Sequence, residues 1–385
     1  MSTAYELAII DDPTLTLADK ARMFPYSALL VIIAIACIGF GVLFAAAQGS
    51  WDPWASRQAT RFGVGVALAC LIAMIDIRLW LRYAYVIFAV SIVALVAVEL
   101  IGQVGKGAQR WLDLGFIQIQ PSEVAKITLV LALARYFHMK PNEEIGSIIG
   151  LAPALAMIAV PAAFILKQPD LGTALMLAAV GGTLLFLAGV RLWKFGLAAA
   201  AIGAAAPVVW ASLRDYQQQR VLTFLDPERD PLGAGYHIIQ SKIALGSGGV
   251  WGKGFMAGTQ SNLNFLPEKQ TDFAFTMLAE EFGLMGCLAL LALYALVIGF
   301  GFFVAVTARS QFGRLLALGV TMNFFLYVFV NIAMVIGLIP VVGVPLPLVS
   351  FGGSALLTIM VGFGLLFCVA VHREVRIGQN IPSAH

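Results

Sequence analysis

The stretch "TDFAFTMLAEEFGLMGCLALLALYALVIGFGFFVAVT", residues 271–307, joins a charged segment to an apolar run about 25 residues long. About 20 apolar residues suffice for a helix to cross the hydrocarbon core of a membrane. Five charged residues gather where this run begins, although charge is costly to bury in lipid. They are Glu268, Lys269, Asp272, Glu280 and Glu281. The stretch therefore predicts a membrane helix with a polar site at its mouth.

The composition of the whole chain agrees with a membrane protein. Of its 385 residues 60% are hydrophobic and only 12% are charged, whereas soluble domains are about 25% charged. We therefore expect an all-α integral membrane protein in which residues 1–385 form a single polytopic domain. Ten apolar runs are long enough to be transmembrane helices: 27–47, 59–76, 79–101, 122–138, 145–165, 171–189, 193–212, 273–307, 313–338 and 350–371.

The distribution of basic residues predicts the orientation of these helices. With a cytoplasmic N-terminus, every cytoplasmic segment carries two basic residues: Lys20/Arg22, Arg78/Arg82, Arg135/Lys140, Arg191/Lys194, Arg309/Arg314 and Arg373/Arg376. The short outer loops and their edges carry fewer in sum: Arg57, Arg61, Lys106, Arg110 and Lys167. The positive-inside rule thus places both termini in the cytoplasm. Residues 213–271 then form one long extracytoplasmic loop between the seventh and eighth helices, and loops of this length are commonly functional.

Asp272 lies where this long loop becomes the eighth helix, and two interpretations of it are open. It could cap the helix and complement the helix dipole. It could also be a general base whose partial burial makes it a better proton acceptor. Glu280 and Glu281 lie about two turns deeper, so at least one must face protein or a water-filled cavity. Pairing with a basic residue of another helix and direct catalysis are the alternatives for them.

A second polar cluster lies in residues 108–127, before and within the fourth helix. Pro121 suits the first turn of that helix, and Glu123 and Lys126 follow at a spacing that puts them on one face. A pair of this kind inside the membrane edge indicates a polar cavity. Arg110 lies in the preceding outer loop, where a guanidinium could bind a phosphate through two hydrogen bonds.

Two further outer segments have weaker signals. Asp170, in "KQPDLGTA" (167–174), is expected to cap the sixth helix. Residues 244–268 are rich in glycine and contain Lys253. Because the segment lacks the Walker pattern, a flexible loop is favoured over a phosphate-binding loop. Neither a metal-ligand motif nor a serine-hydrolase or nucleotide-binding motif is found, and nothing indicates a nucleic-acid partner.

Several of these segments together resemble one family of membrane proteins. They are "DPERDPLGAGYHIIQSKIALGSGGVWGKGF" (226–255), "GTQSNLNFLPEKQTDFAFTMLAEEFG" (258–283), "QRWLDLG" (109–115), "QPSEVAK" (120–126), "KQPDLGTA" and "PLPLVSFGGS" (345–354). The chain resembles the SEDS proteins, the shape, elongation, division and sporulation family, over residues 24–376. Within that family it is similar to the RodA-like elongation branch.

This resemblance implies a peptidoglycan glycosyltransferase of the bacterial cytoplasmic membrane. Its substrate would be lipid II, an undecaprenyl-diphosphate-linked disaccharide peptide, and its partner a class B penicillin-binding protein that cross-links the product. Asp272 matches the essential aspartate of the family. Glu123 and Lys126 match its paired charges, and Arg110 and Gln260 match further functional polar positions.

The chemistry of such a reaction needs few protein groups. The diphosphate is already a good leaving group, so one carboxylate can take a proton from the acceptor hydroxyl while positive charge stabilises the departing diphosphate. Arg110, Lys126 and Lys253 are the candidates for that charge, with a divalent cation, Mg²⁺ or Mn²⁺, as another. Two alternatives stay open. One is a flippase for a lipid-linked sugar, whose critical charges would lie near the bilayer midplane. The other is a non-catalytic scaffold in which Asp272 is only a cap.

Overall fold

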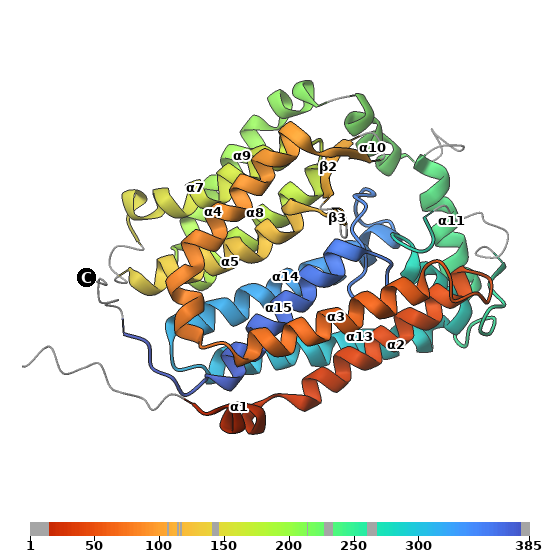
Figure 1. Cartoon of the computed structure of the whole chain (residues 1–385). Coiled ribbons are helices and arrows are strands. Elements are labelled where there is room, and N and C mark those ends of the chain that lie inside the picture. The colour runs from red at the N-terminus through yellow and green to blue at the C-terminus, as the bar shows by residue number, and fades with distance from the viewer. Residues whose placement is uncertain are drawn as a thin grey trace, which may run out of the picture.

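Long helices, most of them lying side by side, make up nearly all of the computed structural model (Figure 1). The structure describes residues 15–105, 108–113, 115, 118–140, 146–213, 215–226, 234–259 and 268–378. The helices are α1 (Leu17–Met23), α2 (Tyr26–Ala46), α3 (Ala55–Met74), α4 (Ile77–Ile101), α5 (Pro121–Met139), α7 (Ile148–Lys167), α8 (Leu171–Leu187), α9 (Leu192–Ser212), α10 (Asp215–Leu225), α11 (Ala234–Ser247), α13 (Ala274–Thr307), α14 (Gln311–Val335) and α15 (Gly353–Val371).

Most of these helices have the character of membrane spans. Six are long and apolar enough to cross a membrane, namely α2, α4, α7, α13, α14 and α15. Two shorter apolar helices are α8 and residues Leu192–Val208 of α9. Each apolar run of the sequence coincides with one helix to within a few residues, so the prediction of a helical membrane protein is confirmed.

Helix α5 explains how a charged segment can belong to such a bundle. It packs against α4, α7, α8, α14 and α15, and 16 of its 19 residues are buried. A helix enclosed by protein on all sides presents no face to lipid, so it can carry ionisable residues that a lipid-facing helix could not. Helix α5 can therefore carry the buried Glu123 and Lys126 within an otherwise apolar bundle.

The expectation of an all-α chain needs one correction, in the connection between α4 and α5. There β1 (Gln103–Gly105), β2 (Ala108–Asp113) and β3 (Gln118–Ile119) form an antiparallel sheet in the order β1-β2-β3. Gly115 between β2 and β3 has a φ of +85°, which glycine adopts without a steric penalty. This sheet positions Arg110, which lies on β2.

The long segment 213–271 also contains regular structure, because α10 and α11 lie within it. Helix α11 packs against α13 and α14. Its Ser241, fully buried, donates a hydrogen bond to the carbonyl of Val335 at 2.9 Å and shares another with the Thr276 hydroxyl at 2.9 Å. This part of the segment is thus attached to the bundle.

The two ends of the described chain lie at the same end of the bundle (Figure 1). Helix α1 lies there, and its Lys20 ammonium donates to the carbonyl of Met74, where α3 ends, at 2.7 Å. Helices α10 and α11 lie at or near the opposite end. The sheet also lies toward that opposite end (Figure 1).

Candidate active site

Asp272 lies in the turn just before α13. The helix begins at Ala274 with Phe273 at the N-cap position, and the Phe273 side chain makes no capping hydrogen bond. Asp272 therefore lies one residue before the N-cap position, at the start of the helix, as the sequence predicted. The residue is half-buried, and its backbone N–H donates to the Glu268 carbonyl at 3.1 Å. This hydrogen bond closes the turn and so fixes the backbone position of Asp272.

Asn331 of α14 holds this turn against the segment that leads to α15. Its side-chain amide is fully buried and donates to the carbonyl of Asp272 at 3.0 Å and to that of Val344 at 2.7 Å. The neighbouring Gly343 lies close to the Asp272 carboxylate, since a Cβ added to Gly343 would be 3.5 Å from Oδ2. The Asp272 carboxylate thus lies on the side of the turn that faces this segment.

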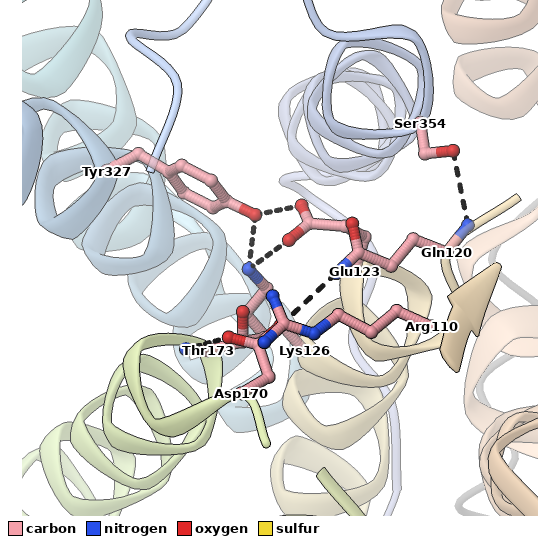
Figure 2. A network of polar contacts seen from close by, with 8 residues as sticks. All are labelled: Arg110, Gln120, Glu123, Lys126, Asp170, Thr173, Tyr327 and Ser354. Atoms are coloured by element: carbon pink, nitrogen blue, oxygen red, sulfur yellow. Dashed lines mark hydrogen bonds and ion pairs between the residues drawn. The ribbon is translucent and has the colours of Figure 1, made fainter. Parts of the chain in front are cut away.

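One helical turn along α14 from Asn331, Tyr327 joins the buried pair that the sequence predicted. The Lys126 ammonium lies 2.7 Å from Glu123 Oε1, so the predicted pairing is present. The Tyr327 hydroxyl donates to the other oxygen of Glu123 and also contacts the Lys126 ammonium. That ammonium lies 4.2 Å from the centre of the Tyr327 ring. All three side chains are buried and point toward one another (Figure 2).

Arg110 and Asp170 form a second polar pair, nearer the surface. The Arg110 Nη1 atom lies 3.7 Å from Asp170 Oδ2, and Nε donates to the carbonyl of Gln168 at 3.0 Å. Asp170 accepts from the backbone N–H of Thr173 at 3.2 Å, so its predicted role as the cap of α8 is confirmed. The Arg110 side chain is 31% exposed, which leaves part of the guanidinium accessible to a ligand.

Gln120 connects these groups to α15. Its side-chain amide donates to Asp170 Oδ2 at 3.4 Å, and its backbone N–H donates to the Ser354 hydroxyl at 3.2 Å. Ser354 in turn donates to the carbonyl of Gln118 at 2.9 Å. Figure 2 shows the resulting network, which spans α5, α8, α14, α15 and the sheet.

The arrangement and the sequence have known counterparts. A family model described as a cell cycle protein, FTSW_RODA_SPOVE, matches residues 22–375. The chain belongs to this family. It is 46% identical over 363 residues to "Peptidoglycan glycosyltransferase MrdB" of Escherichia coli, with 94% of this chain and 96% of that protein covered. With the protein of the same name from Helicobacter pylori it shares 38% identity over 331 residues, with 85% and 86% covered.

Solved structures of the FtsW/RodA/SpoVE family have the same fold. The rod shape determining protein RodA of Thermus thermophilus superimposes with a TM-score of 0.70 at 28% identity, covering 92% of this chain and 98% of that one. A chain from a peptidoglycan synthase complex that coordinates polymerization and crosslinking gives a TM-score of 0.78 at 31% identity, covering 91% and 98%.

Lys253 of this family member lies apart from the network of Figure 2. Its ammonium is 2.8 Å from Glu280 Oε1 and 2.7 Å from the Thr259 hydroxyl. Glu280 is fully buried, so the structural pairing expected for one of the two glutamates is found. Its partner comes from the glycine-rich loop rather than from another helix.

Residues 249–254 of the glycine-rich loop are docked on a break in α13, which corrects the expectation of a flexible loop for these residues, while residues 260–267 lie outside the described part of the chain. Gly283 has a φ of +62° and interrupts the helix. The N–H groups of Lys253 and Gly254 donate to the carbonyls of Glu280 and Glu281, each at 3.0 Å. On the other side of the break, the N–H groups of Leu284 and Met285 donate to the carbonyls of Gly249 and Val250 at 3.0 and 3.1 Å. The loop thus supplies hydrogen bonds at the point where the helix is interrupted.

The structure bears on the predicted site residue Gln260 and on the predicted divalent cation only in part. Gln260 lies outside the described residues. Among the residues that the structure describes, no group of three His, Cys, Asp or Glu side chains is arranged to hold a metal ion. The described part of the chain therefore does not fit a resident metal centre.

Tyr327 and Asn331 were not predicted as site residues. Both are polar residues within the apolar run 313–338, and their separation of four places them on one helix face. This spacing is the one feature of the sequence that could have indicated a shared polar role for Tyr327 and Asn331. Only the fold shows that this face meets Glu123 and Asp272.

Proposed function

We propose that the chain is a peptidoglycan glycosyltransferase that joins lipid II units through β-1,4 linkages during cell elongation. The observation that carries the proposal is that one face of α14 contacts both polar groups: Asn331 donates to the carbonyl of Asp272, and Tyr327, one turn away, bonds to the buried pair of Glu123 and Lys126. The family membership and the 46% identity to MrdB of Escherichia coli support it.

The proposal includes a topology of ten crossings. Helices α2, α3, α4, α5, α7, α8, α9, α13, α14 and α15 would cross the inner membrane. Both termini would be cytoplasmic, which agrees with the excess of basic residues at that end. Asp272 and the network would then lie on the extracytoplasmic side, where the sugar and diphosphate of a lipid-linked substrate are exposed.

In the proposed reaction Asp272 acts as the general base. Its carboxylate takes the proton from the 4-hydroxyl of the acceptor GlcNAc while that oxygen attacks C1 of the donor MurNAc. The bond from C1 to the diphosphate oxygen breaks, and the undecaprenyl diphosphate leaves with the electron pair. A direct displacement inverts the α-linked donor to a β-1,4 linkage, and no acid is needed for so good a leaving group.

The basic residues differ in how well they could stabilise the departing diphosphate. The Arg110 side chain is 31% exposed and that of Lys253 is 26% exposed, whereas that of Lys126 is only 1% exposed. We therefore assign the direct contact to Arg110. Lys126, already shared between Glu123 and Tyr327, would organise the cavity, and Lys253 would contribute while paired with Glu280. Gln260 is proposed as a substrate-binding residue on the family resemblance alone.

A divalent cation, Mg²⁺ or Mn²⁺, would enter with the substrate. Magnesium is commonly bound by one or two carboxylates together with phosphate oxygens, so it needs no preformed cluster. Polymerisation measured at increasing EDTA concentration tests this part of the proposal.

The partner of the polymerase would be a class B penicillin-binding protein that cross-links the new strands. The relative found in a peptidoglycan synthase complex supports a joint assembly of this kind. Co-purification with the candidate transpeptidase from detergent tests it.

The decisive experiment is lipid II polymerisation by the purified protein, with and without that partner. Asp272→Asn should yield no glycan strands, because the amide cannot accept the proton. Asp76→Asn is the matched control, because Asp76 caps α4 at the opposite end of the bundle and asparagine caps as well. Strands from Asp272→Asn would remove the general-base role. No product from folded wild-type protein with its partner would instead favour a flippase.

A further inference from the structure

Two arginines on the outer side of the bundle are not used by the site described above. Arg57 and Arg61 lie in the first two turns of α3, with Ser56 and Thr60 beside them. These four residues line a hollow of about 250 Å³. In the proposed topology these residues lie on the extracytoplasmic side of the membrane, where basic residues are less common. Two arginines together at this position therefore suggest that they bind an anionic ligand.

Neither guanidinium has an acidic partner within the described part of the chain. The nearby Asp52 accepts a 2.5 Å hydrogen bond from the Ser56 hydroxyl instead. Thr60 donates within the helix, to the carbonyl of Ser56 at 3.0 Å. The positive charges of Arg57 and Arg61 are close enough to repel each other. The charge available to a ligand in this hollow therefore comes from two uncompensated guanidinium groups.

Arg61 is held in place by packing. Its guanidinium lies 5.2 Å from the centre of the Phe351 ring. The start of α15 leaves room for it, since a Cβ added to Gly353 would be 2.8 Å from Nη1. A guanidinium positioned by stacking keeps its N–H groups free to bind an anion.

The hollow is joined to the turn of Asp272 through residues 350–351. The Phe351 N–H donates to the carbonyl of Gln270 at 2.8 Å, two residues before Asp272. Gln58 of α3 donates to the carbonyl of Ser350 at 2.9 Å. The network that contains Arg110 also contacts the start of α15, because the Gln120 N–H donates to the Ser354 hydroxyl (Figure 2).

We propose that Arg57 and Arg61 form a second phosphate-binding subsite, which takes the diphosphate of one of the two lipid-linked substrates. This inference rests on the proposed function. Both the growing strand and the incoming unit of that reaction carry a lipid diphosphate, so the enzyme must hold two of them at once. Arg110 serves one diphosphate, and the hollow on α3 serves the other. Guanidinium groups bind phosphate oxygens in pairs, which suits this task.

The test measures binding, so that it does not depend on turnover. Full-length protein carrying Asp272→Asn is placed in nanodiscs, and the number of undecaprenyl diphosphate molecules bound is measured. Two per protein are expected, and one after Arg57→Gln with Arg61→Gln. The Arg57→Lys, Arg61→Lys double variant retains the charge and should restore the second molecule with weaker affinity. Arg309→Gln, at the opposite end of the bundle, is the matched control.

A second arm identifies the source of the phosphate. Nanodiscs containing phosphatidylglycerol replace those of neutral lipid, and the same variants are compared. If the arginine pair binds only a phospholipid headgroup, the double glutamine variant will lose phosphatidylglycerol and keep both diphosphates, which overturns the proposal. The proposal is also overturned if the double glutamine variant still binds two undecaprenyl diphosphate molecules in nanodiscs of neutral lipid.

In the active enzyme the double glutamine variant should raise the KM for lipid II at least tenfold with kcat nearly unchanged. A folded variant is confirmed by its thermal midpoint and elution volume. If wild type polymerises nothing yet binds two diphosphates, the proposed function fails and the subsite stands.

Discussion

At the scale of single residues, Asn331 is the side chain that fixes the position of Asp272. It donates to two backbone carbonyls from a fully buried position. Replacing it by leucine leaves both carbonyls without this donor, and each unsatisfied buried group costs about 1–3 kcal/mol. We expect Asn331→Leu to lower kcat for lipid II at least tenfold.

The kinetic measurement for Asn331 separates positioning from general destabilisation. Because the residue fixes the base rather than the substrate, kcat should fall while KM stays within about twofold. Asn331→Gln keeps the donor and should recover part of the rate. Ser91→Ala removes a buried hydroxyl that bonds to Thr128 elsewhere in the bundle, and it should leave kcat unchanged. An equal loss of kcat in Asn331→Leu and in Ser91→Ala would contradict the positioning role of Asn331.

The pair of Glu123 and Lys126 predicts a different pattern. Removing one member of a buried ion pair leaves an uncompensated charge and costs about 3–5 kcal/mol. Glu123→Ala and Lys126→Ala should therefore each impair polymerisation and lower the thermal midpoint. The double variant Glu123→Lys with Lys126→Glu asks whether pairing alone matters. Recovery of stability without activity would show that each charge has its own task, whereas two harmless single variants would show that the pair is dispensable.

At the scale of elements, the break in α13 depends on glycines in two segments far apart in sequence. A Cβ on Gly252 would lie 2.1 Å from the carbonyl oxygen of Glu281, and its φ is +77°. A Cβ on Gly283 would lie 2.4 Å from the backbone nitrogen of Gly252. These contacts explain why the loop is rich in glycine: the two backbones approach each other too closely for side chains.

We expect Gly252→Ala to disrupt this junction. The left-handed conformation alone costs about 1–2 kcal/mol for alanine, and the clash adds to it. Thermal unfolding in detergent should show a lower midpoint, together with reduced activity because Lys253 and Glu280 lose their register. Gly246→Ala is the control, since a Cβ there meets nothing within 4 Å and alanine favours helix. An unchanged midpoint for Gly252→Ala would mean that the loop does not support the break.

The elements also show what the sequence could and could not predict. The apolar runs predicted the long helices well, because a span must be apolar and about 20 residues long. The docking of residues 248–254 could not be predicted, because it consists of backbone hydrogen bonds, and a glycine-rich segment reads equally as a flexible linker. The pairing of Glu123 with Lys126 was predictable because both lie on one helix. Tyr327 was not, because it approaches them from a distant segment.

At the scale of the whole molecule, the charges at the mouth of α13 fall into separate roles. Glu280 is neutralised by Lys253 at the junction with the loop. Asp272 remains in a turn outside the helix, half-buried beside Gly343. A membrane bundle can carry so many ionisable groups because they lie in protein-enclosed positions. The same arrangement suits a substrate whose lipid is in the bilayer while its sugar and diphosphate are at the surface.

The proposed orientation of the molecule can be tested directly. Trp251 is 79% exposed in the loop docked on α13, and Glu374 lies beyond α15 at the opposite end. In a variant without native cysteines, Trp251→Cys should react with a membrane-impermeant maleimide in intact spheroplasts, because the loop faces outward. Glu374→Cys should react only after permeabilisation. The reverse pattern would place Asp272 on the cytoplasmic side, where a polymerase of exported precursors could not work, and a flippase or scaffold would then be the better description.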